Sequence, residues 1–268
     1  MYKIDLNSDL GEGAAFDAQI IPLITGANIA CGFHAGGSEI MDKTIDLCRA
    51  SGVAFGAHPG YPDRENFGRT KMTVTPKQVY DFTLYQLGAL GAFAVAKGIK
   101  MQHVKPHGAM YNAAAKDPAL AAAIADAIKD FDPSLILLAL ANSEMIKAAK
   151  SRGLRYASEI FADRAYEADG SLRARTLDGS MITDESLAIS RVIRMIKEGK
   201  VTAYSGEYID IEALDRPPNN MYNSTTLLSI YTNNFTIISL CINRKEHLHL
   251  QYYYLLGEIV EISMSNNI

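Results

Sequence analysis

Near its N-terminus the chain carries the sequence DLNSDLGEG at residues 5–13, which predicts a β-strand followed by a glycine-rich turn. In such a strand Asp5, Asn7 and Asp9 point to the same face. Three polar groups on one face are costly in a core unless they meet water, a ligand, a metal ion or one another. The stretch is therefore either an edge strand with a solvated face or part of a functional site.

Predicted strands and helices alternate along the following two hundred residues. Further strands are predicted at 27–31, 53–57, 101–105, 135–139 and 154–158, and helices at 17–24, 38–51, 76–97, 117–130, 143–151 and 183–198. The strand at 135–139 is apolar throughout, which is typical of a parallel sheet covered on both faces. Short connections between alternating elements imply right-handed crossovers, so the sequence predicts an α/β fold with a parallel sheet.

Several helix ends are marked by capping residues. Thr75-Pro76 predicts a helix start, since a threonine N-cap precedes a proline at the first helical position. Ser38 is expected to cap the start of the helix at 38–51, and Thr183 to begin the helix at 183–198. Gly52 and Gly199 are expected to end these two helices in the left-handed conformation.

The composition of the 268 residues is that of an ordinary globular protein, with 48% hydrophobic and 21% charged residues. A formal net charge of −4 without a basic patch argues against a nucleic-acid partner. We find no apolar run that predicts a membrane span and no secretory signal. The odd set of Cys31, Cys48 and Cys241 indicates reduced thiols, so a cytoplasmic location is expected.

Polar residues gather where the predicted strands end. They are Asp9, Glu12, His34, His58, Asp63, Lys105, His107 and Glu159. The carboxyl ends of parallel strands meet at one edge, and in such folds this edge binds ligands. A single histidine such as His34 is more often structural, but strand ends that converge with this chemistry indicate a site.

The chemistry of these residues leaves two interpretations open. Histidines with carboxylates support general acid–base catalysis, and they also suit a divalent metal ion. Lys105 can stabilise an oxyanion or bind a phosphate, or it can extend from a strand end into solvent. Arg164 can grip a substrate carboxylate, or it can pair with Asp163 or Glu167 at the surface. We find no P-loop sequence for ATP.

Five motifs in order resemble the LamB/YcsF family. They are DLNSDLGE at 5–12, ACGFHAG at 30–36, AHPGYPD at 57–63, VKPHGAMYN at 104–112 and EIFADRAY at 159–166. The resemblance extends from residue 1 to about 212. It implies a TIM-like, seven-stranded β/α barrel similar to the glycoside hydrolase and deacetylase barrels. It also implies the role of the A subunit of prokaryotic 5-oxoprolinase, which opens 5-oxoproline to L-glutamate with ATP and separate B and C subunits.

The resemblance implies that the strand-end residues form the active site. The predicted catalytic residues are Asp9, His34, His58, His107 and Glu159. The predicted substrate-binding residues are Asn7, Glu12, Asp63, Lys105 and Arg164. Asp9 or Glu159 is expected to act as the base, and His58 and His107 as acids or oxyanion stabilisers. ATP is the expected cofactor, in a site that the partner subunits can share, and a divalent metal ion is a second candidate.

Two other functions remain open. The histidines and carboxylates also suit a metal-dependent amidohydrolase or deacetylase that acts alone. The absence of a P-loop sequence also suits a non-catalytic binding subunit whose chemistry resides in its partners.

The C-terminal part of the chain departs from the family pattern. Alanine does not occur after Ala213, and Gly257 is the only glycine after Gly206. The sequence therefore predicts a barrel domain at 1–213 and an atypical segment at 214–268, with the last barrel strand atypical or missing. Residues 236–242 have high β propensity and are the best candidate for a substitute strand. Without one, the barrel is left open at two edges.

Overall fold

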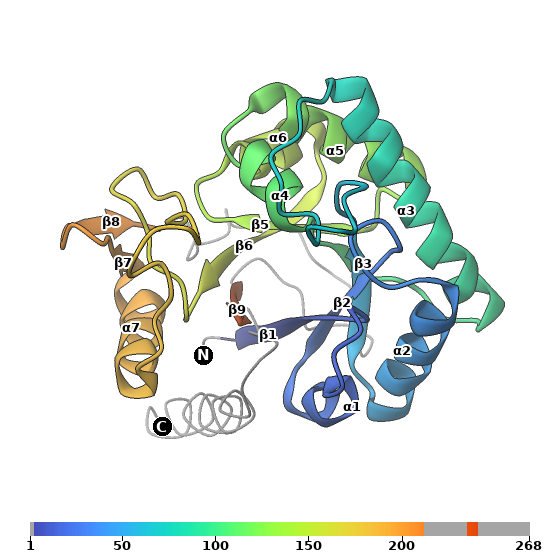
Figure 1. The fold of residues 1–268 in the computed structure, drawn as a ribbon, viewed down its shortest axis with the longest axis horizontal. Helices are drawn as coiled ribbons and strands as arrows, with labels where there is room; N and C mark the ends of the chain where they lie inside the picture. The colour runs from blue at the N-terminus through green and yellow to red at the C-terminus, as the bar shows by residue number, and fades with distance from the viewer. Residues whose placement is uncertain (1–2, 212–234, 241–268) are drawn as a thin grey trace, which may run out of the picture.

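The computed structural model describes residues 3–211 and 235–240, which contain a closed barrel of seven parallel strands (Figure 1). The strands lie in the order β1 (Lys3–Leu10), β2 (Gly26–Ala30), β3 (Ala54–His58), β4 (His103–Val104), β5 (Ile136–Leu140), β6 (Arg155–Phe161) and β9 (Phe235–Leu240). All residues of β5 are buried, as its apolar sequence predicts. The predicted seven-stranded β/α barrel is confirmed.

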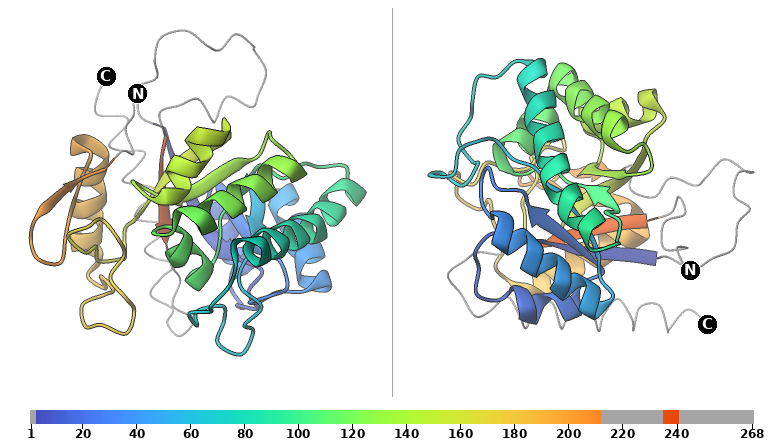
Figure 2. Two further views of the ribbon diagram at one scale, coloured as in Figure 1. Left: turned by 90° about the horizontal axis from the view of Figure 1, so that it is seen from above. Right: turned by 90° about the vertical axis from the view of Figure 1, so that its right-hand side faces the viewer.

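Helices cover the outside of the barrel (Figures 1 and 2). In chain order they are α1 (Asp17–Ile20), the 3₁₀ turn η1 (Ile21–Leu23), α2 (Ser38–Ser51), α3 (Pro76–Ala96), α4 (Gly108–Ala114), α5 (Pro118–Phe131), α6 (Glu144–Arg152) and α7 (Glu185–Glu198). A small antiparallel sheet of β7 (Lys200–Thr202) and β8 (Tyr208–Asp210) lies beside α7, on the opposite side of the molecule from α2 and α3. Among the described helices, none has the length and apolarity that a membrane span requires.

Strand β1 lies inside the sheet and not at its edge. It pairs with β2 on one side, where Asn7 is opposite Gly26, and with β9 on the other, where Asn7 is opposite Ser239. Asp5 and Asn7 are 2% and 0% exposed. The interpretation as an edge strand with a solvated face is therefore wrong, because both edges of the strand are hydrogen-bonded and two of the three residues on its polar face are buried.

A chain of polar side chains lies inside the barrel, below the predicted site. Asn28 donates a 2.6 Å hydrogen bond to Oδ1 of Asn7, and its own Oδ1 lies 2.9 Å from Nε2 of His103. Gly56 makes room for His103, since a Cβ at this position would lie 2.2 Å from the His103 carbonyl oxygen. Buried polar groups that bond to one another avoid the cost of desolvation.

Strand β9 comes from the atypical C-terminal segment and completes the barrel. It pairs in parallel with β1 and with β6, so the sheet closes between the first and sixth strands. The predicted substitute strand at 236–242 is confirmed over residues 236–240, while residues 241 and 242 lie outside the described part of the chain. The interior position explains the β-branched sequence of β9, which suits a strand paired on both sides.

The strongest predicted helix ends are confirmed. Thr75 forms a capping box with Gln78, each side chain meeting the other residue's backbone N–H. Gly52 and Gly199 end α2 and α7 with φ of 68° and 63°, a conformation that glycine adopts without strain.

Two predicted helix starts are wrong by one residue. Ser38 is the first residue of α2, and Gly37 occupies the N-cap position without a side-chain bond. For α7 the N-cap is Asp184, whose carboxylate accepts a 2.9 Å hydrogen bond from the N–H of Leu187. The aspartate displaces Thr183 because a carboxylate is the stronger acceptor and favours the positive end of the helix dipole.

Two of the three cysteines fall in the described part of the chain, and both are free and buried. Burial raises the pKa of the Cys31 and Cys48 thiols to about 12. Cys241 lies outside the described residues. The two described thiols behave as small apolar side chains, since a thiol with so high a pKa is unreactive at neutral pH.

Candidate active site

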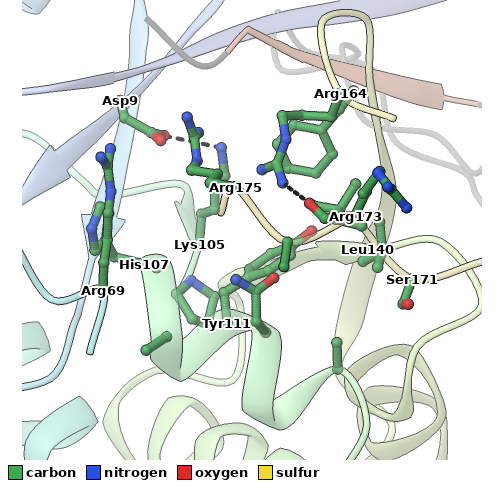
Figure 3. A pocket seen from close by; sticks show the side chains of 18 of the residues that line it. Asp9, Arg69, Lys105, His107, Tyr111, Leu140, Arg164, Ser171, Arg173 and Arg175 are labelled. Atoms are coloured by element: carbon green, nitrogen blue, oxygen red, sulfur yellow. Dashed lines mark hydrogen bonds and ion pairs between the residues drawn. The ribbon is translucent and has the colours of Figure 1, made fainter. Parts of the chain in front are cut away.

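A cavity of about 570 Å³ opens where the barrel strands end (Figure 3). Asp9 near the end of β1, His58 at the end of β3, and Leu140 and Phe161 at the ends of β5 and β6 all line it. The cavity brings together six of the predicted site residues, namely Asp9, Glu12, His58, Lys105, His107 and Arg164. The prediction that the strand ends converge on one edge of the sheet is confirmed.

Lys105 lies at the floor of the cavity between two carboxylates. Its Nζ is 2.9 Å from Oδ1 of Asp9, 3.0 Å from Oε1 of Glu159 and 3.4 Å from Oδ1 of Asn7. Lys105 is only 3% exposed, so the interpretation as a lysine extending into solvent is wrong. The barrel holds it inside because three acceptors replace the water that its ammonium group gives up.

Asp9 is the carboxylate of this network that faces the cavity, with 20% of its side chain exposed. Burial opposes its ionisation, but the charges of His58 and Lys105 and a hydrogen bond to His58 outweigh this effect. They hold the pKa of Asp9 well below its ordinary value. Asp9 is therefore ionised at neutral pH and can accept a hydrogen bond from a water or a substrate in the cavity.

Glu159 lies inside β6 and has no solvent exposure, although the sequence placed it just after a strand. The Tyr111 hydroxyl donates a 2.7 Å hydrogen bond to Oε2, while Oε1 faces Lys105. Tyr111 comes from α4, a helix that was not predicted in the VKPHGAMYN motif. Glu159 thus acts as a buried counter-charge that fixes Lys105.

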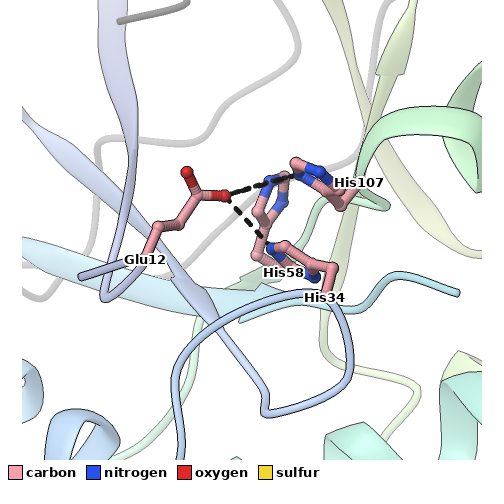
Figure 4. Close-up of side chains that lie close together, drawn as sticks. All are labelled: Glu12, His34, His58 and His107. Atoms are coloured by element: carbon pink, nitrogen blue, oxygen red, sulfur yellow. Dashed lines mark hydrogen bonds and ion pairs between the residues drawn. The ribbon is translucent and has the colours of Figure 1, made fainter. Parts of the chain in front are cut away.

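Three histidines and Glu12 form a compact cluster beside Asp9 (Figure 4). Oε1 of Glu12 lies 3.1 Å from Nε2 of His34, 3.9 Å from Nε2 of His58 and 3.5 Å from Nδ1 of His107. The rings of His34 and His107 stack in parallel with centroids 3.7 Å apart. These four residues form a group with the donor atoms of a metal site, and His34 belongs to it.

The surroundings raise the pKa of His58 and lower the pKa of His107. Burial opposes protonation of His58, but the charges of Asp9 and Glu12 and a hydrogen bond to Asp9 raise its pKa. Burial and the charges of His58 and His34 lower the pKa of His107 well below its ordinary value. Such opposed pKa values in neighbouring groups are a feature of sites that move protons.

Asp63 does not line the cavity, although it was predicted as a substrate-binding residue. Its carboxylate accepts hydrogen bonds from the Asn66 side chain and the Thr70 N–H, which lower its pKa, and its carbonyl accepts from Gly68. These bonds shape a tight loop in which Phe67 has a φ of 59°. The Phe67 carbonyl lies 2.9 Å from Nε2 of His107, so the loop that Asp63 braces contacts the site through Phe67.

Arg164 is 5% exposed and lines the cavity, so the interpretation as a surface residue is wrong. Its guanidinium donates to the backbone carbonyls of Arg173 and Ser180 at 2.6 and 3.4 Å (Figure 3). Glu167 pairs instead with Arg173, at 2.8 Å. Arg164 thus ties the loop after β6 to the wall of the cavity.

Several residues that shape the site were not singled out from the sequence. They are Asn28, Arg69, Tyr111, Lys116, Arg173 and Arg175. Asn28, which donates a 2.9 Å hydrogen bond to Asp9, is a polar residue in an otherwise apolar predicted strand, a signal that could have identified it. The arginines lie in loops without a local pattern, and only the folded chain brings them to the cavity.

Comparison with known proteins identifies the family. The model of the LamB/YcsF family matches residues 4–215, which include every predicted site residue. The chain belongs to the LamB/YcsF family. As the sequence predicts, the match ends near the start of the atypical segment, at residue 215 against a predicted segment of 214–268.

Named relatives of this member of the LamB/YcsF family are similar over most of the chain. A protein of Clostridium beijerinckii that is named as the A subunit of 5-oxoprolinase is 57% identical over 217 residues, covering 79% of this chain and 85% of its own. A protein of the same name from Campylobacter jejuni is 54% identical over 218 residues, covering 80% of this chain and 86% of its own. At such identities the relatives share the family fold.

A solved structure of the same type also matches this member of the LamB/YcsF family. It is the lactam utilization protein from Thermus thermophilus, which is 38% identical, superimposes with a TM-score of 0.80, and covers 97% of both chains. The barrel described above is therefore the fold of an established structural type.

Proposed function

We propose that this chain is the A subunit of an ATP-dependent 5-oxoprolinase that opens 5-oxo-L-proline to L-glutamate together with separate B and C subunits. The observation that carries the proposal is the Asp9–Lys105–Glu159 network, which lies in the cavity of a chain whose relatives are named as A subunits of 5-oxoprolinase. In the reaction one water adds to the lactam carbonyl carbon, the C–N bond breaks and the nitrogen takes up a proton, while a second water takes up the terminal phosphoryl group of ATP to give ADP and phosphate.

The charge of the cavity supports an acidic substrate. Cationic side chains outnumber the acidic ones among the described lining residues, and they are Arg69, Lys105, Lys116, Arg164, Arg173 and Arg175. The carboxylate of 5-oxoproline needs a cation in such a site, and a guanidinium can bind it through two parallel hydrogen bonds. We propose Arg164 for this role because its guanidinium is buried at the cavity wall, while Lys105, whose ammonium group already meets three acceptors, contributes its positive charge.

The roles of the carboxylates follow from their exposure. Of the two carboxylates predicted as the base, Asp9 faces the cavity and we propose it as the group that orients the attacking water. Without a metal ion on its Nε2, His58, which lies 3.4 Å from Asp9 and has a raised pKa, suits a residue that delivers a proton to the leaving nitrogen. Glu159 and Asn7 hold the Lys105 ammonium group in place from inside the barrel.

The proposal includes ATP as a co-substrate, because a five-membered lactam is a stable amide and a poor electrophile. The chain contains no P-loop sequence, so we propose that the ATP site is formed with or by the B and C subunits. A cytoplasmic location belongs to the same proposal, and the two free buried thiols support it.

The test is glutamate release from 5-oxoproline by this chain mixed with family B and C subunits, with and without ATP. The matched variants are Lys105→Met, and Lys147→Met at an exposed lysine that pairs with Glu144. We expect ATP-dependent release that falls at least about 100-fold in Lys105→Met and is unchanged in Lys147→Met. Full activity of Lys105→Met in the complex would instead indicate a binding subunit whose chemistry resides in its partners.

A second candidate function is favoured by the group of Glu12 and the three histidines. A hydrolase that uses a metal ion at this group would hydrolyse an amide bond or remove an acetyl group without partner subunits. Hydrolysis of 5-oxoproline or of N-acetylated compounds without ATP and without the other subunits would support it.

A further inference from the structure

Two backbone carbonyls fix the protonation of the rings of His58 and His107. Nδ1 of His58 lies 2.6 Å from the carbonyl oxygen of Lys105, and Nε2 of His107 lies 2.9 Å from that of Phe67. A carbonyl oxygen only accepts hydrogen bonds, so each of these ring nitrogens carries a proton. In the neutral rings the lone pairs are therefore on Nε2 of His58 and on Nδ1 of His107.

These two lone-pair nitrogens face each other at 2.8 Å. Two acceptors at this distance repel unless a proton or a cation lies between them or beside them. The Glu12 carboxylate adds a negative charge 3.5 Å from the His107 nitrogen. The arrangement therefore favours a proton or a cation shared by His58, His107 and Glu12.

His34 adds a fourth ligand atom to the cluster. The parallel stack with His107 holds its ring beside the other two, and its Nε2 lies 3.1 Å from Oε1 of Glu12. The four ligand atoms lie within 4.8 Å of one another, against about 3.3–3.6 Å between the ligands of a tetrahedral site whose ligands are each about 2.0–2.2 Å from a metal ion. Binding an ion therefore requires side-chain rotations that draw these four residues together.

We propose that Glu12, His34, His58 and His107 bind one divalent transition-metal ion of the zinc type. Imidazole nitrogens favour Zn²⁺ and its neighbours in the first transition row over Mg²⁺ and Ca²⁺, which prefer oxygen ligands. Metal-bound histidines usually donate their other N–H to a carbonyl or carboxylate, as His58 and His107 do here.

The surroundings of the cluster support a binding site over a set of structural hydrogen bonds. The loop that supplies the Phe67 carbonyl holds that residue in the left-handed region, a strained conformation that is retained at functional sites. Glu12, His58 and His107 line the cavity, while His34 is 1% exposed. The four side chains hold such an ion on one side, and the cavity gives a further ligand access to its other side.

The test measures metal binding and not activity, so it can fail independently of the proposed function. Protein freed of metal by a chelator is titrated with Zn²⁺ by calorimetry and with Co²⁺ by visible absorption, and its melting temperature is recorded with and without Zn²⁺. We expect one ion per chain, a tetrahedral Co²⁺ spectrum, and a higher melting temperature because the ion binds the folded state.

The variants are His107→Ala, Glu12→Gln and, as a matched control, His103→Gln. His103 is also a buried histidine, but it bonds to Asn28 in the barrel interior and is not part of the cluster. We expect at least about tenfold weaker Zn²⁺ binding in the first two variants and unchanged binding in the control. Glu12→Gln keeps the test decisive if His107→Ala does not fold.

Two results would overturn the proposal. One is the absence of a binding step for Zn²⁺ and Co²⁺ in folded wild-type protein, which would show that the cluster shares a proton and no metal ion. The other is equal affinity of the wild type, Glu12→Gln and His107→Ala, which would place a bound ion elsewhere on the chain.

Discussion

The ammonium group of Lys105 lies 3.0 Å from Oε1 of Glu159, and the two side chains are 4% and 0% exposed. Both charges have lost their water, and each is stabilised by additional partners, Asp9 for Lys105 and Tyr111 for Glu159. In an interior of low dielectric constant such a pair is strong only while it is complete. The position of Lys105 in the cavity therefore depends on a carboxylate that never meets solvent.

Replacing Glu159 by glutamine is expected to destabilise the protein by about 3–5 kcal/mol, because it leaves the charge of Lys105 without its buried partner. Urea unfolding at pH 7, followed by circular dichroism, measures the change. The matched variant is Glu144→Gln, whose carboxylate pairs with Lys147 at 2.7 Å at the surface, where the loss is expected to stay below about 1 kcal/mol. Equal losses in the two variants would show that the buried pair is not stabilising.

Replacing Tyr111 by phenylalanine removes the hydroxyl that holds Glu159 and keeps the ring. We expect kcat for glutamate release by the reconstituted complex to fall about tenfold, the loss of one hydrogen bond to a charged group, with a small change in KM. The control is Tyr80→Phe, which removes a 2.9 Å hydrogen bond to Asp130 at the surface. If kcat is the same in both variants, Tyr111 has no part in positioning Lys105.

Acid stability is expected to depend on His103. Burial, and the charges of Lys105 and His58, lower its pKa from 6.5 to about 3. Above pH 6.5 the ring is neutral in both states and has no effect. Between pH 6.5 and about 3 the unfolded chain binds a proton that the folded chain does not. This group therefore lowers the free energy of unfolding by about 1.4 kcal/mol for each unit by which the pH decreases.

Urea unfolding at several pH values between about 4 and 7 checks this dependence. His103→Gln is expected to have a shallower slope than the wild type over that range, even though it is less stable at neutral pH. Parallel slopes for the two proteins would mean that His103 is protonated in the folded state.

Filling the space at Gly56 is expected to destabilise the barrel. In Gly56→Ala the new Cβ would lie 2.2 Å from the His103 carbonyl oxygen, so the backbone must shift at a cost of about 1–3 kcal/mol. Gly88 on α3 has no neighbouring atom within 4 Å, and Gly88→Ala is expected to stabilise by about 0.5–1 kcal/mol. Thermal unfolding compares them, and a stable Gly56→Ala would contradict the tight packing inside the barrel.

Much of the fold was predictable because the deciding interactions are local. The capping box of Thr75 and Gln78 involves residues three positions apart, and the apolar run of β5 requires cover on both faces wherever it lies. The common face of Asp5, Asn7 and Asp9 follows from the two-residue period of a strand. Local rules failed by one residue at Ser38 and at Thr183, where neighbouring groups compete for the same position.

The site was predictable as a set of residues and not as an arrangement. The motifs identified the histidines, and the barrel was needed to show that His34, His58 and His107 share one carboxylate. Asp63 carries the same chemistry as Asp9 in the sequence, yet it shapes a loop while Asp9 lines the cavity. A residue type and its place after a strand do not determine which way its carboxylate points.

The sequence by itself determined the alternation of strands and helices, the polar face of β1, the family, and the point where the family pattern ends. Only the tertiary structure decided that Lys105 is buried between Asp9 and Glu159, that Tyr111 holds this pair from α4, and that β9 closes the barrel. The reason is physical. Periodicity and capping act over a few residues, whereas these contacts join distant strands and exist only once the sheet has closed on itself.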